Sequence, residues 1–174
     1  MLGENPDLAA ITANLGQTFE VEQNTYKPFP CGIVVHPIID GCITLATTHD
    51  VMAKSVARVV LRVNPLVLEL TARKTPATTA EAKLSLYHSA AAAIVARRIT
   101  EREYEEDFVA DPDVLSLRTR VEAIADPGIR EDEADIVVEL RNGRSLHHHV
   151  EHALGSAQRP MSDVEIEAKF RERC

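Results

Sequence analysis

The spacing of apolar residues changes along the chain from a helical period to a period of two, and this change limits the possible folds most strongly. Within residues 36–48 the apolar side chains fall into two neighbouring rows at helical spacing. These rows are Ile39, Ile43 and Ala46, beside Ile38, Cys42 and Leu45. A stripe of that width predicts a largely buried helix.

From residue 57 onward the apolar residues alternate with polar ones. One face carries Ala57, Val59, Leu61 and Val63, and the opposite face carries Arg58 and Arg62. After Asn64-Pro65 the alternation continues through Leu66, Leu68 and Leu70. Both segments are therefore expected to be strands with one face toward water.

Start and stop signals predict the remaining elements. Helices are expected from Asn5-Pro6-Asp7 to Gly16, from Thr78 to about Arg98, from Thr100, within residues 111–119, and from Ser162. Three of these starts have the spacing of a capping box, namely Thr78 with Glu81, Thr100 with Glu103, and Ser162 with Glu165. Short strands are expected at residues 19–22 and 121–125.

Residues 134–152 have the pattern of a hairpin that turns at Asn142-Gly143. A two-residue turn at this point would put the two apolar rows on opposite faces of the sheet. A three-residue loop with a left-handed Gly143 instead pairs Val138 with Leu146 and places both rows on one face. We therefore predict the three-residue loop.

Helices and antiparallel strands alternate without a regular strand–helix–strand rhythm. The expected fold is therefore α+β, a two-layer sandwich of a mostly antiparallel sheet packed with helices. With 174 residues the chain suits one domain, 1–174, that can bury a sizeable core.

Composition argues against several classes of partner. The net charge is −8 and no basic stripe is present, so a nucleic-acid partner is not expected. No apolar run approaches the roughly 18 residues needed to span a membrane. The three cysteines are odd in number and form no Cys-x-x-Cys pair, which favours a reduced, cytoplasmic compartment.

The strongest candidate for a functional centre is the segment of residues 26–40, whose first part, residues 26–32, carries two prolines and a glycine. These residues exclude a regular helix before residue 33 and form a rigid loop, bracketed by Lys27 and His36. At the start of a helix, His36 is placed to bind an anion or to act as an acid or base. The alternative is a proline-rich connector with a histidine that only begins a helix.

A second polar group, Ser85, Tyr87 and His88, interrupts the alanine-rich helix. Ser85 and His88 are three residues apart, so they could point together into a site. The alternative is a satisfied polar edge of a core helix. Because no Gly-x-Ser-x-Gly motif surrounds Ser85, serine nucleophile chemistry is not expected.

Four histidines near the hairpin, His147, His148, His149 and His152, raise the possibility of a metal site. On a strand, His148 points opposite to its two neighbours, and no cysteine or carboxylate pattern completes a zinc set. We therefore expect no metal, and a hairpin strand that carries histidines on both faces.

Several motifs, taken in order, resemble the MmgE/PrpD family, which includes 2-methylcitrate dehydratase, cis-aconitate decarboxylase and iminodisuccinate epimerase. The motifs are Lys27-Pro28-Phe29-Pro30-Cys31 with His36 and Ile39-Asp40, Pro76 to Thr78 with Glu81-Ala82-Lys83-Leu84-Ser85-Leu86, Asn142-Gly143, Gly155, Pro160-Met161-Ser162-Asp163, and Lys169-Phe170. They match only the C-terminal α+β domain of such proteins. The all-helical domain that normally precedes it is expected to be missing here.

The resemblance implies an enzyme without an organic cofactor that moves a proton beside a carboxylate of a di- or tricarboxylate, as in propionate metabolism. It implies a site between two domains, usually in a homodimer. His36 would then do acid–base work or bind a carboxylate, and Lys27 would support the loop or bind a carboxylate. We also expect Ser85, Tyr87 and His88 to bind substrate. Tyr87 stands one position earlier than the tyrosine of some relatives, which counts against a decarboxylase role for it.

Two hypotheses follow. The chain is the C-terminal domain of a dehydratase, isomerase, epimerase or decarboxylase, and is inactive in isolation. Alternatively, it is a non-catalytic fragment or an interaction module that associates with itself through exposed apolar surface.

Overall fold

The computed structural model describes residues 7–17 and 19–173, which form helices and a four-stranded sheet. The strands are β1 (Val56–Val63), β2 (Val121–Ala125), β3 (Ala134–Leu140) and β4 (Ser145–Val150). The α-helices are α1 (His36–Thr48), α2 (Pro65–Thr71), α3 (Thr79–Ala82), α4 (Leu86–Ala96), α5 (Glu106–Val109), α6 (Pro112–Arg118) and α7 (Asp163–Arg173). Short 3-10 turns are η1 (Leu8–Ile11), η2 (Glu20–Gln23), η3 (Ile33–Val35), η4 (Ala53–Ser55) and η5 (Arg102–Tyr104).

The sheet has the strand order β2-β1-β3-β4. β3 pairs antiparallel with both β1 and β4, whereas β1 and β2 run parallel. The predicted α+β fold is confirmed, and the sheet is mixed rather than purely antiparallel. The parallel pair arises because the chain crosses from β1 to β2 through helices α2 to α6, a connection long enough to restore the strand direction.

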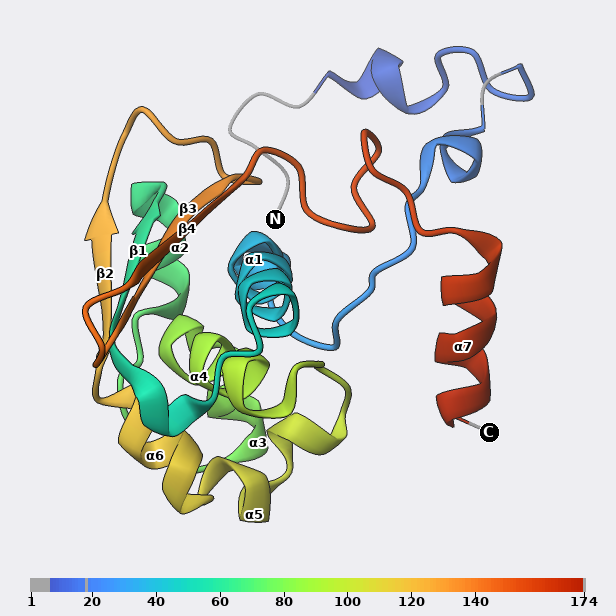
Figure 1. Ribbon diagram of the computed structural model, residues 1–174. Helices are drawn as coiled ribbons and strands as arrows, with labels where there is room; N and C mark the ends of the chain where they lie inside the picture. Colours follow the sequence, from blue (N-terminus) through green and yellow to red (C-terminus); the bar gives the residue numbers. More distant parts are fainter. Residues whose placement is uncertain (1–6, 18, 174) are drawn as a thin grey trace.

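Helices α1 and α4 cover one face of the sheet and contact each other (Figure 1). α1 lies on β3 and β4, and Gly41 lets it approach closely. A Cβ atom at Gly41 would come within 2.9 Å of Val150 Cγ2 and closer still to Ile136 Cδ1. The predicted burial of α1 is confirmed, since Ile38, Ile39 and Cys42 are fully buried there.

The opposite face of the sheet is polar. Arg58 on β1 pairs with Glu122 on β2 at 2.6 Å, and Arg62 pairs with Asp126 at 2.5 Å. The prediction of a strand with one wet face is therefore confirmed for β1. Ala57 is nevertheless exposed, because a bulge between Val56 and Arg58 turns Val56 into the core in its place.

The strand predicted through Leu66, Leu68 and Leu70 is wrong, since these residues form helix α2. The Asn64 side chain accepts a hydrogen bond from Leu66 N at 3.0 Å, and Pro65 occupies the first helical turn. An N-cap followed by proline is a strong helix start. The alternation of leucines concealed that signal.

The continuous helix predicted from Thr78 to about Arg98 is also wrong. It divides into α3 and α4 at Ser85, whose backbone is extended and bridges to Ala72. The Ser85 hydroxyl caps α4 by accepting from His88 N at 3.1 Å. The Thr78 capping box is real, but it starts only the short helix α3.

The hairpin between β3 and β4 is confirmed, including its register. Val138 pairs with Leu146, and Leu140 N donates to Arg144 O at 2.8 Å across a three-residue loop. Gly143 in that loop has a φ of +85°, as predicted. Both apolar rows therefore face α1.

Both ends of the described chain lie on the side of α1 that faces away from the sheet (Figure 1). The predicted first helix is reduced to η1 after the cap Asp7, while Asn5-Pro6 falls outside the described residues. Residues 19–22 are not a strand, because residues 20–23 form η2. The Ser162 capping box that starts α7 is confirmed.

The short helix predicted after Thr100 corresponds to the turn η5 and the helix α5. The helix predicted within residues 111–119 is α6, and the strand predicted at residues 121–125 is β2. Within residues 7–17 and 19–173, every helix is too short or too polar to cross a membrane.

Candidate functional site

The loop that precedes α1 places His36 at the edge of the core. Phe29 and Cys31 are buried and anchor the loop, while the proline at position 37 follows His36 in the first turn of α1. The His36 side chain is only 3% exposed. Its ring stands edge-on to the Phe29 ring, with centroids 5.3 Å apart. Packing therefore fixes the orientation of the imidazole.

Burial, and after it the positive charge of Lys27, lower the pKa of His36 to about 4. Hydrogen bonding with the backbone of Cys31 and Phe29 opposes this shift without cancelling it. The imidazole is therefore neutral at pH 7. Its Nε2 atom is buried and has no hydrogen-bond partner among the described residues, which is a costly arrangement for a polar atom.

A cavity of about 170 Å³ adjoins this ring. Its walls are the loop residues 25, 27 and 28, residues 33 and 36–37, Asp132, and the segment 153–156 that follows β4. Lys27 and His36, the two residues predicted from the loop, both line it. They share the cavity with one carboxylate, that of Asp132.

Gly155 fixes the second wall of the cavity against the first. It has a φ of +81°, and its N–H donates to Arg159 O at 2.8 Å. A Cβ atom here would lie 2.5 Å from Tyr26 O and closer still to the Pro28 ring. Only glycine meets both requirements at once, the left-handed backbone and the close approach.

Two charged side chains, those of Asp40 and Lys169, form contacts with the segments that make up the cavity walls. Asp40, on the buried side of α1, pairs with Arg159 and accepts from Leu154 N at 3.2 Å. Lys169 on α7 donates to the carbonyl of Lys27 and, at 3.3 Å, to the carbonyl of the next residue. Residues distant in sequence thus meet around the loop.

The second predicted group does not line this cavity. Ser85 is buried, and besides capping α4 it donates to Arg73 O at 2.6 Å. Tyr87 is nearly buried, burial raises the pKa of its hydroxyl, and Lys74 lies 5.5 Å from the centre of its ring. The substrate-binding roles predicted for Ser85, Tyr87 and His88 stay predictions.

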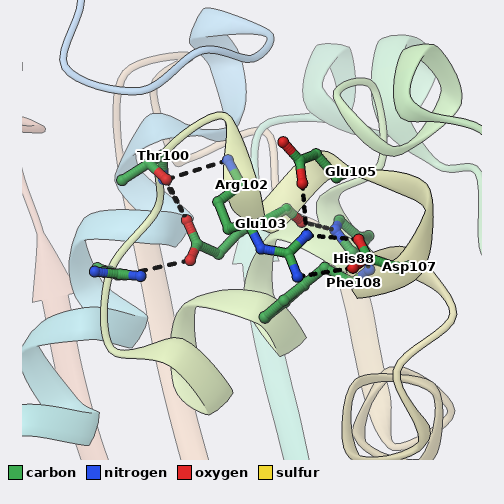
Figure 2. A network of polar contacts seen from close by, with 8 residues as sticks. His88, Thr100, Arg102, Glu103, Glu105, Asp107 and Phe108 are labelled. Atoms are coloured by element: carbon green, nitrogen blue, oxygen red, sulfur yellow. Dashed lines mark hydrogen bonds and ion pairs between the residues drawn. The ribbon is translucent and has the colours of Figure 1, made fainter. Parts of the chain in front are cut away.

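His88 belongs to a polar network between α4 and the segment 98–108 (Figure 2). Its Nε2 atom lies 2.8 Å from Glu103 O. Because a carbonyl oxygen can only accept, Nε2 carries the proton and donates, and in the neutral ring Nδ1 is then unprotonated. Glu103 is itself buried and accepts from the backbone and the hydroxyl of Thr100, both at 2.7 Å. Burial lowers the pKa of His88, so this histidine is also neutral.

The histidines of β4 divide between the two faces of the strand, as predicted. His147 and His149 are exposed on the polar face and lie against Asp135, at 2.5 Å and 3.7 Å, whereas His148 is half-buried toward α1. Among the described residues no group of three or more histidine, cysteine or acidic side chains could hold a metal ion.

Asp132 and Ser156 are the cavity residues that sequence reasoning missed. Asp132 lies in the turn between β2 and β3, and Ser156 follows Gly155 after the last strand. No motif marks Asp132. Gly155 was a usable signal, because a lone glycine in a loop can mark a close approach of two chain segments.

A search of curated proteins gave no match to this chain. A family model does match: the MmgE/PrpD C-terminal domain, over residues 29–174. The matched region begins inside the rigid loop and includes His36, Asp132 and the segment around Gly155. The chain belongs to the MmgE/PrpD C-terminal domain family.

Proposed function

We propose that this chain is the C-terminal part of a cofactor-independent MmgE/PrpD-type enzyme that acts on a di- or tricarboxylate as a dehydratase, isomerase, epimerase or decarboxylase. One observation carries the proposal: a buried, neutral His36 with an unpartnered Nε2 atom adjoins a cavity that also holds Lys27. A bound molecule would supply the missing hydrogen-bond partner. Lys27 would attract a carboxylate of that molecule.

The electrostatics support an acid–base role for His36. With a pKa of about 4, the free imidazole is a weak base. A carboxylate bound beside it would favour the protonated form and raise its pKa toward neutrality. His36 would then accept a proton from carbon next to the carboxylate, or return one, with a basicity that depends on bound substrate.

The opposite wall of the site would come from a helical domain, because the resemblance to the family implies a site that lies between two domains. The surface at the cavity supports this, because Ile33, which lines the cavity, is 68% exposed. Tyr26, next in the chain to the lining residue Lys27, is 64% exposed. Apolar side chains at a cavity mouth favour a covering partner. We therefore expect no measurable turnover of 2-methylcitrate or cis-aconitate by the 174-residue chain alone.

The carboxylate site can be tested without turnover. The imidazole ¹⁵N resonances of His36 are followed by NMR while succinate, a simple dicarboxylate, is added. We expect a saturable shift of these resonances, and a several-fold weaker affinity for Lys27→Met. Lys54→Met is the matched control, since Lys54 is exposed and lies outside the cavity lining.

An absent shift, or equal affinities for Lys27→Met and Lys54→Met, would contradict the carboxylate site. The catalytic proposal has its own test, in which the chain is co-expressed with the helical domain of a family member. Turnover restored in the pair and lost with His36→Gln would support it. Full turnover with His36→Gln would remove His36 from the chemistry.

The alternative proposal, a self-associating interaction module, also has an observation in its favour. Val164 and Phe170 on α7 are both exposed. A helix that presents large apolar side chains to water favours association with another apolar surface. Homodimer formation and a cytoplasmic location stay proposals. The unpaired thiols of Cys31 and Cys42 support the cytoplasmic location, because free thiols persist in a reducing compartment.

A further inference from the structure

The segment of residues 25–31, which carries Lys27 to the cavity, forms no backbone–backbone hydrogen bond among the described residues. Its two prolines have no N–H group to donate. The first such bond after it runs from Gly32 N to Lys83 O, at 3.1 Å. Because no helix or strand holds this segment, side chains must supply the polar contacts with its backbone.

Two side chains make such contacts. The His36 ring is hydrogen-bonded to the backbone of Phe29 and Cys31. The ammonium group of Lys169, on α7, donates to the carbonyl of Lys27 and, at 3.3 Å, to the carbonyl of the proline that follows. An ammonium group has three N–H donors, so one lysine can serve both carbonyls. Lys169 therefore holds the part of the loop that His36 does not contact.

The position of the Lys27 side chain depends on this backbone contact. No carboxylate forms an ion pair with Lys27 in the part of the chain that the structure describes, so its direction follows from the backbone that bears it. A small displacement of the backbone at residue 27 would move the ammonium group away from the cavity. Lys169 is not among the residues that line this cavity, so its contact is with the loop and not with a ligand.

Helix α7 is otherwise set apart from the core. It lies beside the loop, on the side of α1 that faces away from the sheet (Figure 1). An open groove of about 550 Å³ is lined by α7 on one side, and by Ile43 of α1 and residues 97–100 on the other. The contact of Lys169 with the loop is therefore a specific tether between α7 and the site.

We propose that Lys169 is a positioning residue of the site beside His36, which holds the backbone of residues 27 and 28 so that the Lys27 side chain stays at the cavity. This inference rests on the proposed carboxylate site and adds to it a residue of α7 that acts through Lys27. A second observation supports it. The positive charges of both Lys27 and Lys169 lower the pKa of His36, so both ammonium groups lie near the ring.

The test is a double-mutant cycle on the affinity of the 174-residue chain for succinate, measured from the His36 ring resonances. Lys169→Met removes the ammonium group and should weaken binding several-fold, about as much as Lys27→Met does. The variant with both substitutions should show no further loss, because Lys169 acts only through Lys27.

Two further variants make the cycle specific. Lys169→Arg keeps a cationic donor at the end of a long side chain and should restore most of the affinity. Arg171→Met removes an exposed cation from the same helix, outside the cavity lining, and should bind as the parent chain does. If Lys169→Met binds as tightly as the parent chain, or if the two losses add in the double variant, the positioning role is refuted while the carboxylate site stands.

A parent chain that does not bind succinate would refute the carboxylate site, and the positioning role is then decided without a ligand. The positive charge of Lys27 lowers the pKa of His36, so Lys27→Met should raise that pKa in the parent chain. If Lys169 holds Lys27 in place, the same substitution should raise the pKa less in the Lys169→Met background. An equal rise in both backgrounds would mean that Lys27 keeps its position without Lys169, and the inference would be wrong.

Discussion

The burial of a neutral His36 predicts a specific dependence of stability on pH. The unfolded histidine has a pKa of 6.5 and the folded one a pKa of about 4, so the unfolded state takes up its proton first as the pH falls. Protonation of His36 therefore has no effect on the free energy of unfolding well above pH 6.5. It destabilises the fold progressively between pH 6.5 and 4, and the effect is constant below that window.

The size of the effect follows from linkage. Each unit of pKa difference corresponds to about 1.4 kcal/mol, so the full window amounts to about 3 kcal/mol. Between pH 7.5 and pH 5 the expected loss is about 2 kcal/mol. For a domain whose total stability is about 5–15 kcal/mol, this loss is large enough to measure.

The assay is urea unfolding of the parent chain and of His36→Gln at pH 7.5, 6 and 5. Glutamine keeps a polar side chain but does not titrate, so the difference in pH dependence between the two chains isolates His36. Contributions from other groups, including the buried His88, are present in both chains and cancel. If the two chains lose the same stability between pH 7.5 and 5, His36 is not a buried neutral imidazole and the electrostatic reasoning fails.

Three further predictions concern single side chains. Gly155→Ala should destabilise the fold by about 2 kcal/mol more than Gly143→Ala, by thermal unfolding, because both positions have positive φ but only Gly155 lacks room for a Cβ atom. Equal losses would mean that backbone strain alone matters. Ser85→Ala should cost about 1–2 kcal/mol in urea unfolding, since it removes the cap of α4 and leaves Arg73 O without its donor; a loss within error would rule out that capping role. Phe170→Asp should shift the chain toward monomer in sedimentation equilibrium if α7 mediates self-association, and an unchanged distribution would place the interface elsewhere.

Local signals predicted the elements wherever neighbouring residues alone decide the conformation. The register of the hairpin followed from parity, because a shift by one residue would have moved Val138 and Leu146 to different faces. Helix α1 followed from the width of its apolar stripe. The same reasoning failed at Leu66. The alternation of leucines favoured a strand and the Asn64-Pro65 cap favoured a helix, and the cap decided the structure.

The break at Ser85 could not be derived from local sequence, since a capping box and an alanine-rich run both favour one long helix. Ser85 leaves the helix because its backbone bridges to Ala72 and its hydroxyl binds Arg73 O, twelve residues earlier. Such partners are brought close only by the folded chain.

The sequence by itself determined that the segment 26–36 is rigid and that it presents Lys27 and His36 together, because proline restricts the backbone locally. Only the tertiary structure decided what surrounds them. The packing of Gly155 on the loop, and the turn that carries Asp132, place a second wall and an opposite charge beside His36 from residues about a hundred positions away. The burial that makes His36 neutral comes from the same packing, and no pattern of neighbouring residues specifies it.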